Sequence, residues 1–105
     1  MAFIDEFNFD LLKNEAENLV VNELGRQLES YPETICRCND CITDMAAMTL
    51  NMVKPLYRVS LLGSLYTATA MDEKGYATSI REAVFTAIER VRKNPSHEVA
   101  GEADE

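Results

Sequence analysis

The sequence predicts a small, mainly α-helical domain. Two segments carry apolar residues at every third or fourth position, and a third is apolar around most of a helical circumference. A proline follows each of the three segments, as expected where helices stop. With 105 residues, the chain has the size of one domain. We therefore expect three main helices around one core, with a cysteine turn and a short hairpin between them.

The first helix is expected from about residue 8 to residue 30. It should end before Tyr31 and Pro32, because proline disfavours helical geometry in the preceding residue and has no N–H to donate. The apolar positions that define its buried face are Phe9, Leu12, Ala16, Leu19, Val20, Leu24 and Leu28.

The second helix is expected from a cap at Asp40 to about Val53, where Lys54 and Pro55 stop it. A helix this apolar in so small a domain must be covered from several directions, which is easiest if a second copy covers part of it. We therefore predict a homodimer, and the central helix of a monomeric bundle is the alternative. The residues that make the segment apolar are Ile42, Met45, Ala46, Met48, Leu50, Met52 and Val53, with Thr49 among them.

Residues 56–70 alternate between apolar and polar positions around Gly63 and Ser64, which predicts a hairpin, with an irregular extended loop as the alternative. The last helix is expected from a capping box at Ser79, or earlier from Asp72, to Asn94. The predicted domain spans residues 1–97. The acidic tail, residues 98–105, is expected to be disordered.

Charge excludes some classes of function. The net charge of −8 argues against a general nucleic-acid coat, which needs a surplus of lysine and arginine. No apolar run approaches the roughly 18 residues that cross a bilayer. The acidic N-terminus lacks the basic start and apolar middle of a signal peptide, so we expect a cytoplasmic protein without membrane contact. The middle of the chain, residues 34–97, is slightly basic and would suit a small anionic ligand.

The cysteines predict a metal site. Cys36, Cys38 and Cys41 form a C-x-C-x-x-C pattern, and in a reducing compartment clustered thiolates favour Zn²⁺ over disulfides. Structural zinc has four ligands, and His97, the only histidine, would complete a Cys₃His site. The alternatives are cysteines that pack as small hydrophobic residues, or a redox-sensitive pair with one thiol left over.

Catalysis is not expected. The sequence has no glycine-rich phosphate loop, no H-E-x-x-H pattern and no serine nucleophile with a base. Asn14 and Glu17 are expected to make structural hydrogen bonds instead of a catalytic pair.

The cysteine segment resembles the signature of the late-competence protein ComFB family. The resemblance is carried by Cys36-x-Cys38-x-x-Cys41-x-x-Asp44, then Ala46, Ala47, Leu50, Asn51, Pro55 and Tyr57, and on either side by Asn14-x-x-Glu17-x-x-Val20 and Ala87-Ile88-x-x-Val91-x-x-Asn94-Pro95. It implies a small helical homodimer without catalytic function. It further implies zinc held by cysteines in some members and cyclic di-GMP bound in others.

Residue chemistry suits that nucleotide. Arginine pairs with guanine or phosphate, a carboxylate accepts from the guanine N–H groups, and tyrosine stacks on the base. A two-fold axis would duplicate such a set and match a two-fold ligand. Ordinary roles are open for each residue: helix capping, core packing or a solvated charge. The candidate ligand-binding residues are Arg37, Asp44, Lys54, Tyr57, Arg58 and Arg81.

Two functions are therefore expected to compete. The first is a non-enzymatic cytosolic receptor that binds cyclic di-GMP and regulates a protein partner in competence, motility or a related surface process. The second is a zinc-stabilised dimeric protein-interaction module with no nucleotide ligand. A thiol redox sensor is a third alternative. The sequence does not distinguish cyclic di-GMP from cyclic di-AMP.

Overall fold

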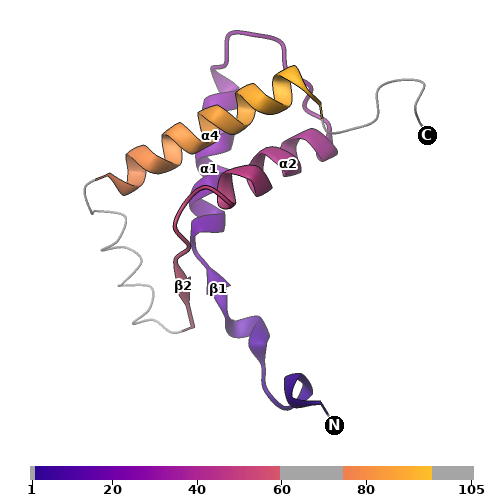
Figure 1. Ribbon diagram of the computed structural model, residues 1–105, viewed down its shortest axis with the longest axis vertical. Helices are drawn as coiled ribbons and strands as arrows, with labels where there is room; N and C mark the ends of the chain where they lie inside the picture. Colours follow the sequence, from indigo (N-terminus) through magenta and orange to yellow (C-terminus); the bar gives the residue numbers. More distant parts are fainter. Residues whose placement is uncertain (1, 60–74, 96–105) are drawn as a thin grey trace, which may run out of the picture.

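The computed structural model describes residues 2–59 and 75–95 (Figure 1). Its three α-helices are α1 (Ala16–Glu29), α2 (Asn39–Leu50) and α4 (Tyr76–Lys93). Two short strands, β1 (Lys13–Asn14) and β2 (Tyr57–Arg58), form an antiparallel pair in which Lys13 faces Arg58. Two 3-10 turns, Phe3–Glu6 and Phe9–Leu11, precede β1. The predicted mainly helical fold with three helices is confirmed for this part of the chain.

The three helices pack against one another around a single core. α2 and α4 run side by side in opposite directions, and α1 crosses them (Figure 1). The buried residues of each helix recur every three or four positions, because residues at this spacing lie on one face, and α4 buries two adjacent residues in two of its turns. The buried residues are Ala16, Val20, Leu24 and Leu28 on α1, Cys41, Met45 and Thr49 on α2, and Ile80, Ala83, Val84, Ala87, Ile88 and Val91 on α4.

One face of α2 is covered within a single chain. Met45 and Thr49 are 0% exposed, and the Thr49 hydroxyl donates to the Met45 carbonyl at 2.8 Å, so this buried polar group is satisfied. The apolar residues on the other sides of α2, Ile42, Ala46, Met48 and Leu50, are only half-buried. The homodimer stays a prediction, and the large apolar surface exposed on the described residues lies elsewhere, mostly before β1.

The predicted start of the first helix is wrong. α1 begins at Ala16, not near residue 8. The Asn14 side-chain oxygen accepts from the Ala16 N–H at 3.1 Å and from the Leu56 N–H at 2.8 Å. Glu15 donates its backbone N–H to the Leu56 carbonyl at 2.8 Å. These bonds tie the segment to a partner about 40 residues away, and such tertiary contacts override the local helical periodicity.

The predicted caps of the other two helices are also wrong. Cys38, not Asp40, caps α2, because its Sγ accepts from the Cys41 N–H at 3.4 Å. α4 begins at Tyr76, after Gly75 in the left-handed region at φ 97°. Ser79 therefore lies inside the helix, and its N–H donates to the Gly75 carbonyl at 2.8 Å. The earlier start at Asp72 lies outside the described residues.

The predicted C-terminal ends of the helices agree better with the structure than the predicted starts do. α1 ends at Glu29, just before Tyr31 and Pro32, and α4 ends at Lys93, just before Asn94. α2 ends at Leu50, three residues before the predicted Val53. Proline and asparagine act locally at these positions, so sequence rules locate them well.

The hairpin expectation is only partly testable. Tyr57–Arg58 does form a strand, but its partner is β1, which precedes it by more than 40 residues. The predicted turn at Gly63 and Ser64, His97 and the predicted tail at residues 98–105 all lie outside the described residues. Among the described helices, none has the length and apolar character needed to span a membrane.

Asn14→Ala is expected to lower the free energy of unfolding by about 1–3 kcal/mol, measured by urea denaturation. The substitution leaves the N–H groups of Ala16 and Leu56 without their side-chain acceptor. Asn14→Asp keeps an oxygen acceptor and should retain most of the stability.

Asn18→Ala is the matched control. The Asn18 amide makes one exposed hydrogen bond to Glu15 at 3.3 Å, so its loss should change stability by less than about 0.5 kcal/mol. Equal effects of the Asn14 and Asn18 substitutions would contradict the role assigned to Asn14.

Candidate functional site

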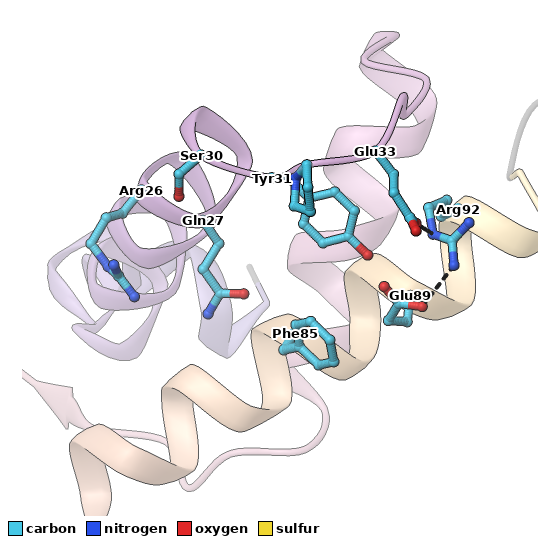
Figure 2. Close-up of a pocket in the computed structure, with 9 residues that line it drawn as sticks. Arg26, Gln27, Ser30, Tyr31, Glu33, Phe85, Glu89 and Arg92 are labelled. Carbon is cyan, nitrogen blue, oxygen red and sulfur yellow. Dashed lines mark hydrogen bonds and ion pairs between the residues drawn. The ribbon is translucent and has the colours of Figure 1, made fainter.

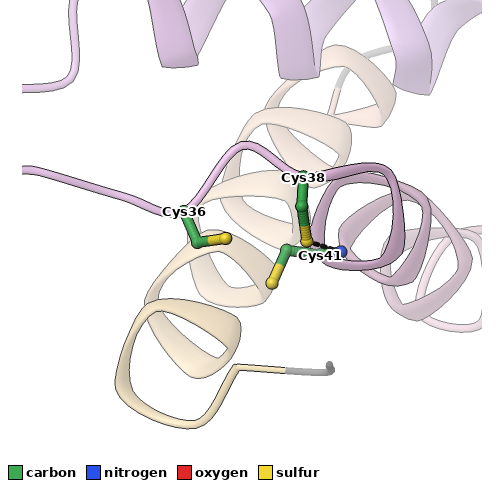
Figure 3. A group of neighbouring side chains, drawn as sticks. All are labelled: Cys36, Cys38 and Cys41. Atoms are coloured by element: carbon green, nitrogen blue, oxygen red, sulfur yellow. Dashed lines mark hydrogen bonds between the residues drawn. The ribbon is translucent and has the colours of Figure 1, made fainter. Parts of the chain in front are cut away.

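The three cysteines converge at the start of α2 (Figure 3). Their Sγ atoms all lie within 4.8 Å of one another. Cys36 is exposed on the segment that leads into the helix, Cys38 is half-buried at the cap, and Cys41 is 0% exposed in the first turn. The predicted cysteine residues are therefore brought together in space.

This donor set fits a thiolate-bound zinc ion. Zn–S bonds of about 2.3 Å in a tetrahedron place sulfur atoms about 3.8 Å apart, so a contraction of about 1 Å would suffice. Because Cys36 is exposed, rotation of its side chain can supply most of that movement. The helix N-terminus also favours thiolates through its partial positive charge. Three sulfur ligands leave one position of a tetrahedral site to another donor.

The C-terminal end of α4 lies beside the first half of α2. Asn94 and Pro95 line a cavity of about 690 Å³ together with Asp44 and Met48. Asp44 is three residues after Cys41 on α2. Pro95, the last described residue, therefore lies near the side of α2 that carries Asp44, one helical turn after Cys41.

The six predicted nucleotide ligands are dispersed over the molecule. The Arg37 guanidinium donates to the Leu28 carbonyl at 2.7 Å and closes the end of α1. Asp44 is half-buried beside the end of α4. Lys54 is exposed after α2, and its carbonyl accepts from the Tyr76 hydroxyl at 2.7 Å.

Arg81 lies on a further surface, near Glu23 and Arg26. Its guanidinium donates to the Thr78 hydroxyl at 2.9 Å. The pKa of Glu23 is lowered, chiefly because Arg26 donates hydrogen bonds to its carboxylate at 2.9 and 2.6 Å. This surface is therefore organised by an ion pair on α1, and Arg81 is the only predicted ligand among the residues that line it.

Of the six predicted nucleotide ligands, which all lie in the described part of the chain, only Tyr57 and Arg58 line the same cavity. Tyr57 is 57% exposed, and the Arg58 Nε lies 3.3 Å from a Glu15 carboxylate oxygen. Sequence reasoning missed several lining residues because it placed them on a continuous helix, and no local signal shows that β1 pairs with β2. The cavity, of about 580 Å³, is lined by Leu12, Lys13, Asn14, Glu15, Glu17, Asn18, Tyr57 and Arg58.

A second cavity missed by sequence reasoning lies where the end of α1 meets α4 (Figure 2). Its volume is about 490 Å³. Tyr31 and Phe85 form its aromatic part, with ring centroids 6.5 Å apart. Arg92 lies at one end, 3.1 Å from Glu33 and 2.9 Å from Glu89, and the hydrogen bond that it donates to the Glu89 carboxylate is the main cause of its raised pKa. The exposed Phe85 on the outer face of the last helix is the one sequence signal that could have located it.

Comparison with known proteins agrees with the resemblance noted in the sequence. The family model described as late competence development protein ComFB matches residues 13–95. A solved structure, the late competence protein ComFB from Bacillus subtilis, is 26% identical, covers 81% of this chain and 94% of its own, and has a TM-score of 0.64. No curated protein matches the chain. Because the family model covers most of the sequence, the chain belongs to the ComFB family.

Proposed function

We propose that this ComFB-family chain is a non-enzymatic, zinc-stabilised dimeric module that acts by docking a protein partner. The observation that carries the proposal is the convergence of three cysteine Sγ atoms within 4.8 Å at the N-terminus of α2. The absence of catalytic motifs from the sequence supports a binding role.

His97 is the proposed fourth ligand. It follows Pro95 by two residues, and two residues of chain span at most about 7 Å. Pro95 lines a cavity with Asp44, which lies one helical turn beyond Cys41. A histidine imidazole extends that reach further, so the end of α4 supports a Cys₃His set.

The metal would link two segments that are far apart in the sequence and that already contact each other through the Arg92–Glu33 ion pair. Cys36 and Cys38 belong to the connection between α1 and α2, in which Ile35 is 7% exposed and packs in the core. His97 follows α4. Zinc contributes folding free energy when it links such segments, so it would fix the helical surface that a partner recognises.

Removal of zinc is expected to lower the melting temperature by at least about 10 °C. The chain should be purified without chelator, assayed for zinc, and melted before and after treatment with EDTA. Cys36→Ser should lose zinc and melt like the chelated protein, because Cys36 is exposed and serine is a poor substitute for a thiolate ligand.

Thr34→Ala, two residues away and also exposed, is the matched control and should keep both zinc and melting temperature. His97→Ala should weaken zinc binding about tenfold or more if the imidazole is a ligand. A metal-depleted protein that melts like freshly purified protein would contradict the zinc proposal. Full zinc affinity in His97→Ala would contradict only the fourth ligand.

Cyclic di-GMP binding is a second candidate function, supported by the cavity around Tyr57. It combines an exposed tyrosine for stacking, the Arg58 guanidinium for guanine O6 and N7, and the Glu17 carboxylate for guanine N–H groups. A volume of about 580 Å³ lies within the range of small-molecule sites.

The charges of this cavity suit a base better than a phosphate. Lys13 and Arg58 are balanced by Glu15 and Glu17. The two phosphates of the nucleotide would need further cations from outside this cavity. Guanine recognition at Tyr57 is therefore the part of this candidate that the described residues support best.

Tyr57→Ala is expected to weaken cyclic di-GMP binding about 10- to 100-fold in isothermal titration calorimetry, because stacking contributes about 1–3 kcal/mol per base. Tyr57→Phe keeps the ring and should bind within about threefold of the unmodified chain. Cyclic di-AMP, titrated in parallel, tests selectivity for guanine.

Arg90→Ala is a control for surface charge, since Arg90 is exposed on α4 and lines a different cavity. An absence of heat with micromolar cyclic di-GMP would refute the receptor function. Unchanged affinity in Tyr57→Ala would refute this location for the base.

A further inference from the structure

The residues before β1 form an apolar arm that the described chain leaves uncovered. Residues 2–12, here called the N-terminal arm, are all exposed and run away from the three helices (Figure 1). The phenylalanine rings of the arm contact one another, with centroids 4.9 to 6.4 Å apart. Its large apolar residues, between 47% and 67% exposed, are Phe3, Ile4, Phe7, Phe9, Leu11 and Leu12.

The area involved is large for a chain of this size. With about 200 Å² for each such side chain, the arm exposes on the order of 600 Å² of apolar surface, at the upper end for a monomeric protein. The arm also contains Asp5, Glu6 and Asp10 and no basic residue. Acidic groups oppose binding to anionic lipid, so the arm suits a protein surface better than a membrane.

A cavity that could receive an aromatic residue of the arm lies at the C-terminal end of α1. The cavity between Tyr31 and Phe85 is open to solvent, with Phe85 52% exposed, and its volume of about 490 Å³ can accept an aromatic side chain (Figure 2). Arg26 and Arg92 contribute guanidinium groups to its lining, and the Arg26 side chain is 61% exposed. Both guanidinium groups are already paired with carboxylates, Arg26 with Glu23 and Arg92 with Glu33 and Glu89, so the match between cavity and arm is aromatic and apolar.

The arm of the same chain does not reach this cavity. The arm joins the N-terminal end of α1, and the cavity lies at the C-terminal end, a helix of 14 residues or about 21 Å away. The arm also points in the opposite direction (Figure 1). A second copy whose α1 lies antiparallel to the first would bring its own arm to the cavity, and two-fold symmetry would make the contact reciprocal.

The outer face of α1 is suited to such a contact. Val21 is 55% exposed midway between arm and cavity, and Gly25 follows it one turn later. A Cβ added at Gly25 would meet no atom within 4 Å, so the packing of one chain does not explain a glycine there. Glycine weakens a helix relative to alanine, but it permits close approach of another backbone.

We propose that the N-terminal arm docks on a second copy of this chain and places a phenylalanine in the Tyr31–Phe85 cavity, with the two α1 helices crossing at Val21 and Gly25. This inference rests on the proposed dimer and locates its contact on α1 and the arm instead of α2. Two exchanged arms would bury about 1,200 Å² of their own apolar surface and a similar area of the receiving faces, which is enough for a stable dimer.

The test compares molar masses of the full chain by light scattering. The combined variant Phe3→Ser, Phe7→Ser, Phe9→Ser and the single variant Phe85→Ser should each halve the mass at concentrations where the unmodified chain is dimeric. Met52→Ser, 41% exposed after α2 and part of neither the arm, α1 nor the cavity lining, should stay dimeric. All the substituted side chains are exposed, so every variant should keep its helical circular dichroism.

Photo-crosslinking then locates the contact. A benzophenone-bearing analogue at Phe7, in a mixture of ¹⁴N- and ¹⁵N-labelled chains, should yield mixed-isotope crosslinks to peptides containing Tyr31 or Phe85. Crosslinks confined to one isotope or to other peptides would overturn the inference, and so would a dimer that persists after the triple substitution. A monomeric unmodified chain would overturn both the inference and the proposed dimer, while its zinc content would still test the metal site separately.

Discussion

The burial of one face of α2 between α1 and α4 sets the position of the candidate metal site. Cys41, Met45 and Thr49 occur every four residues on this face, and each is 0% exposed. Cys41 is thus both a core residue and the innermost of the three thiols. Its backbone N–H in turn holds the Cys38 sulfur at 3.4 Å, so core packing places two of the sulfur atoms before any metal binds. Such preorganisation lowers the entropic cost of assembling the ligands.

Local rules predicted the ends of the helices better than their beginnings. Pro32 and Pro95 affect the residues next to them, so the ends of α1 and α4 follow from the sequence. The start of α1 depends on Leu56, which supplies a donor and an acceptor to residues 14 and 15 from a distant part of the chain. Apolar periodicity before Ala16 resembles a helix, but nothing in it reveals that partner.

The residues of the candidate sites also differ in how far local sequence rules predict them. Spacing alone identified the cysteines, because a short turn forces such residues together. The six nucleotide ligands were chosen by chemical type, which does not indicate which helices become neighbours, and only Tyr57 and Arg58 share a cavity. The Tyr31–Phe85 cavity joins two elements more than 50 residues apart and could not be read from either one. Residues 8–12 of the arm were predicted to be part of the first helix, so their exposure was also missed.

The ligands of a zinc ion at the cysteine cluster can be measured directly. If zinc links the start of α2 to the end of α4, X-ray absorption at the zinc edge of the purified chain will show three sulfur atoms at about 2.3 Å and one nitrogen at about 2.0–2.1 Å. A first shell made only of oxygen and nitrogen, or a freshly purified protein with no zinc edge, would contradict the central claim that these three thiols form a structural metal site.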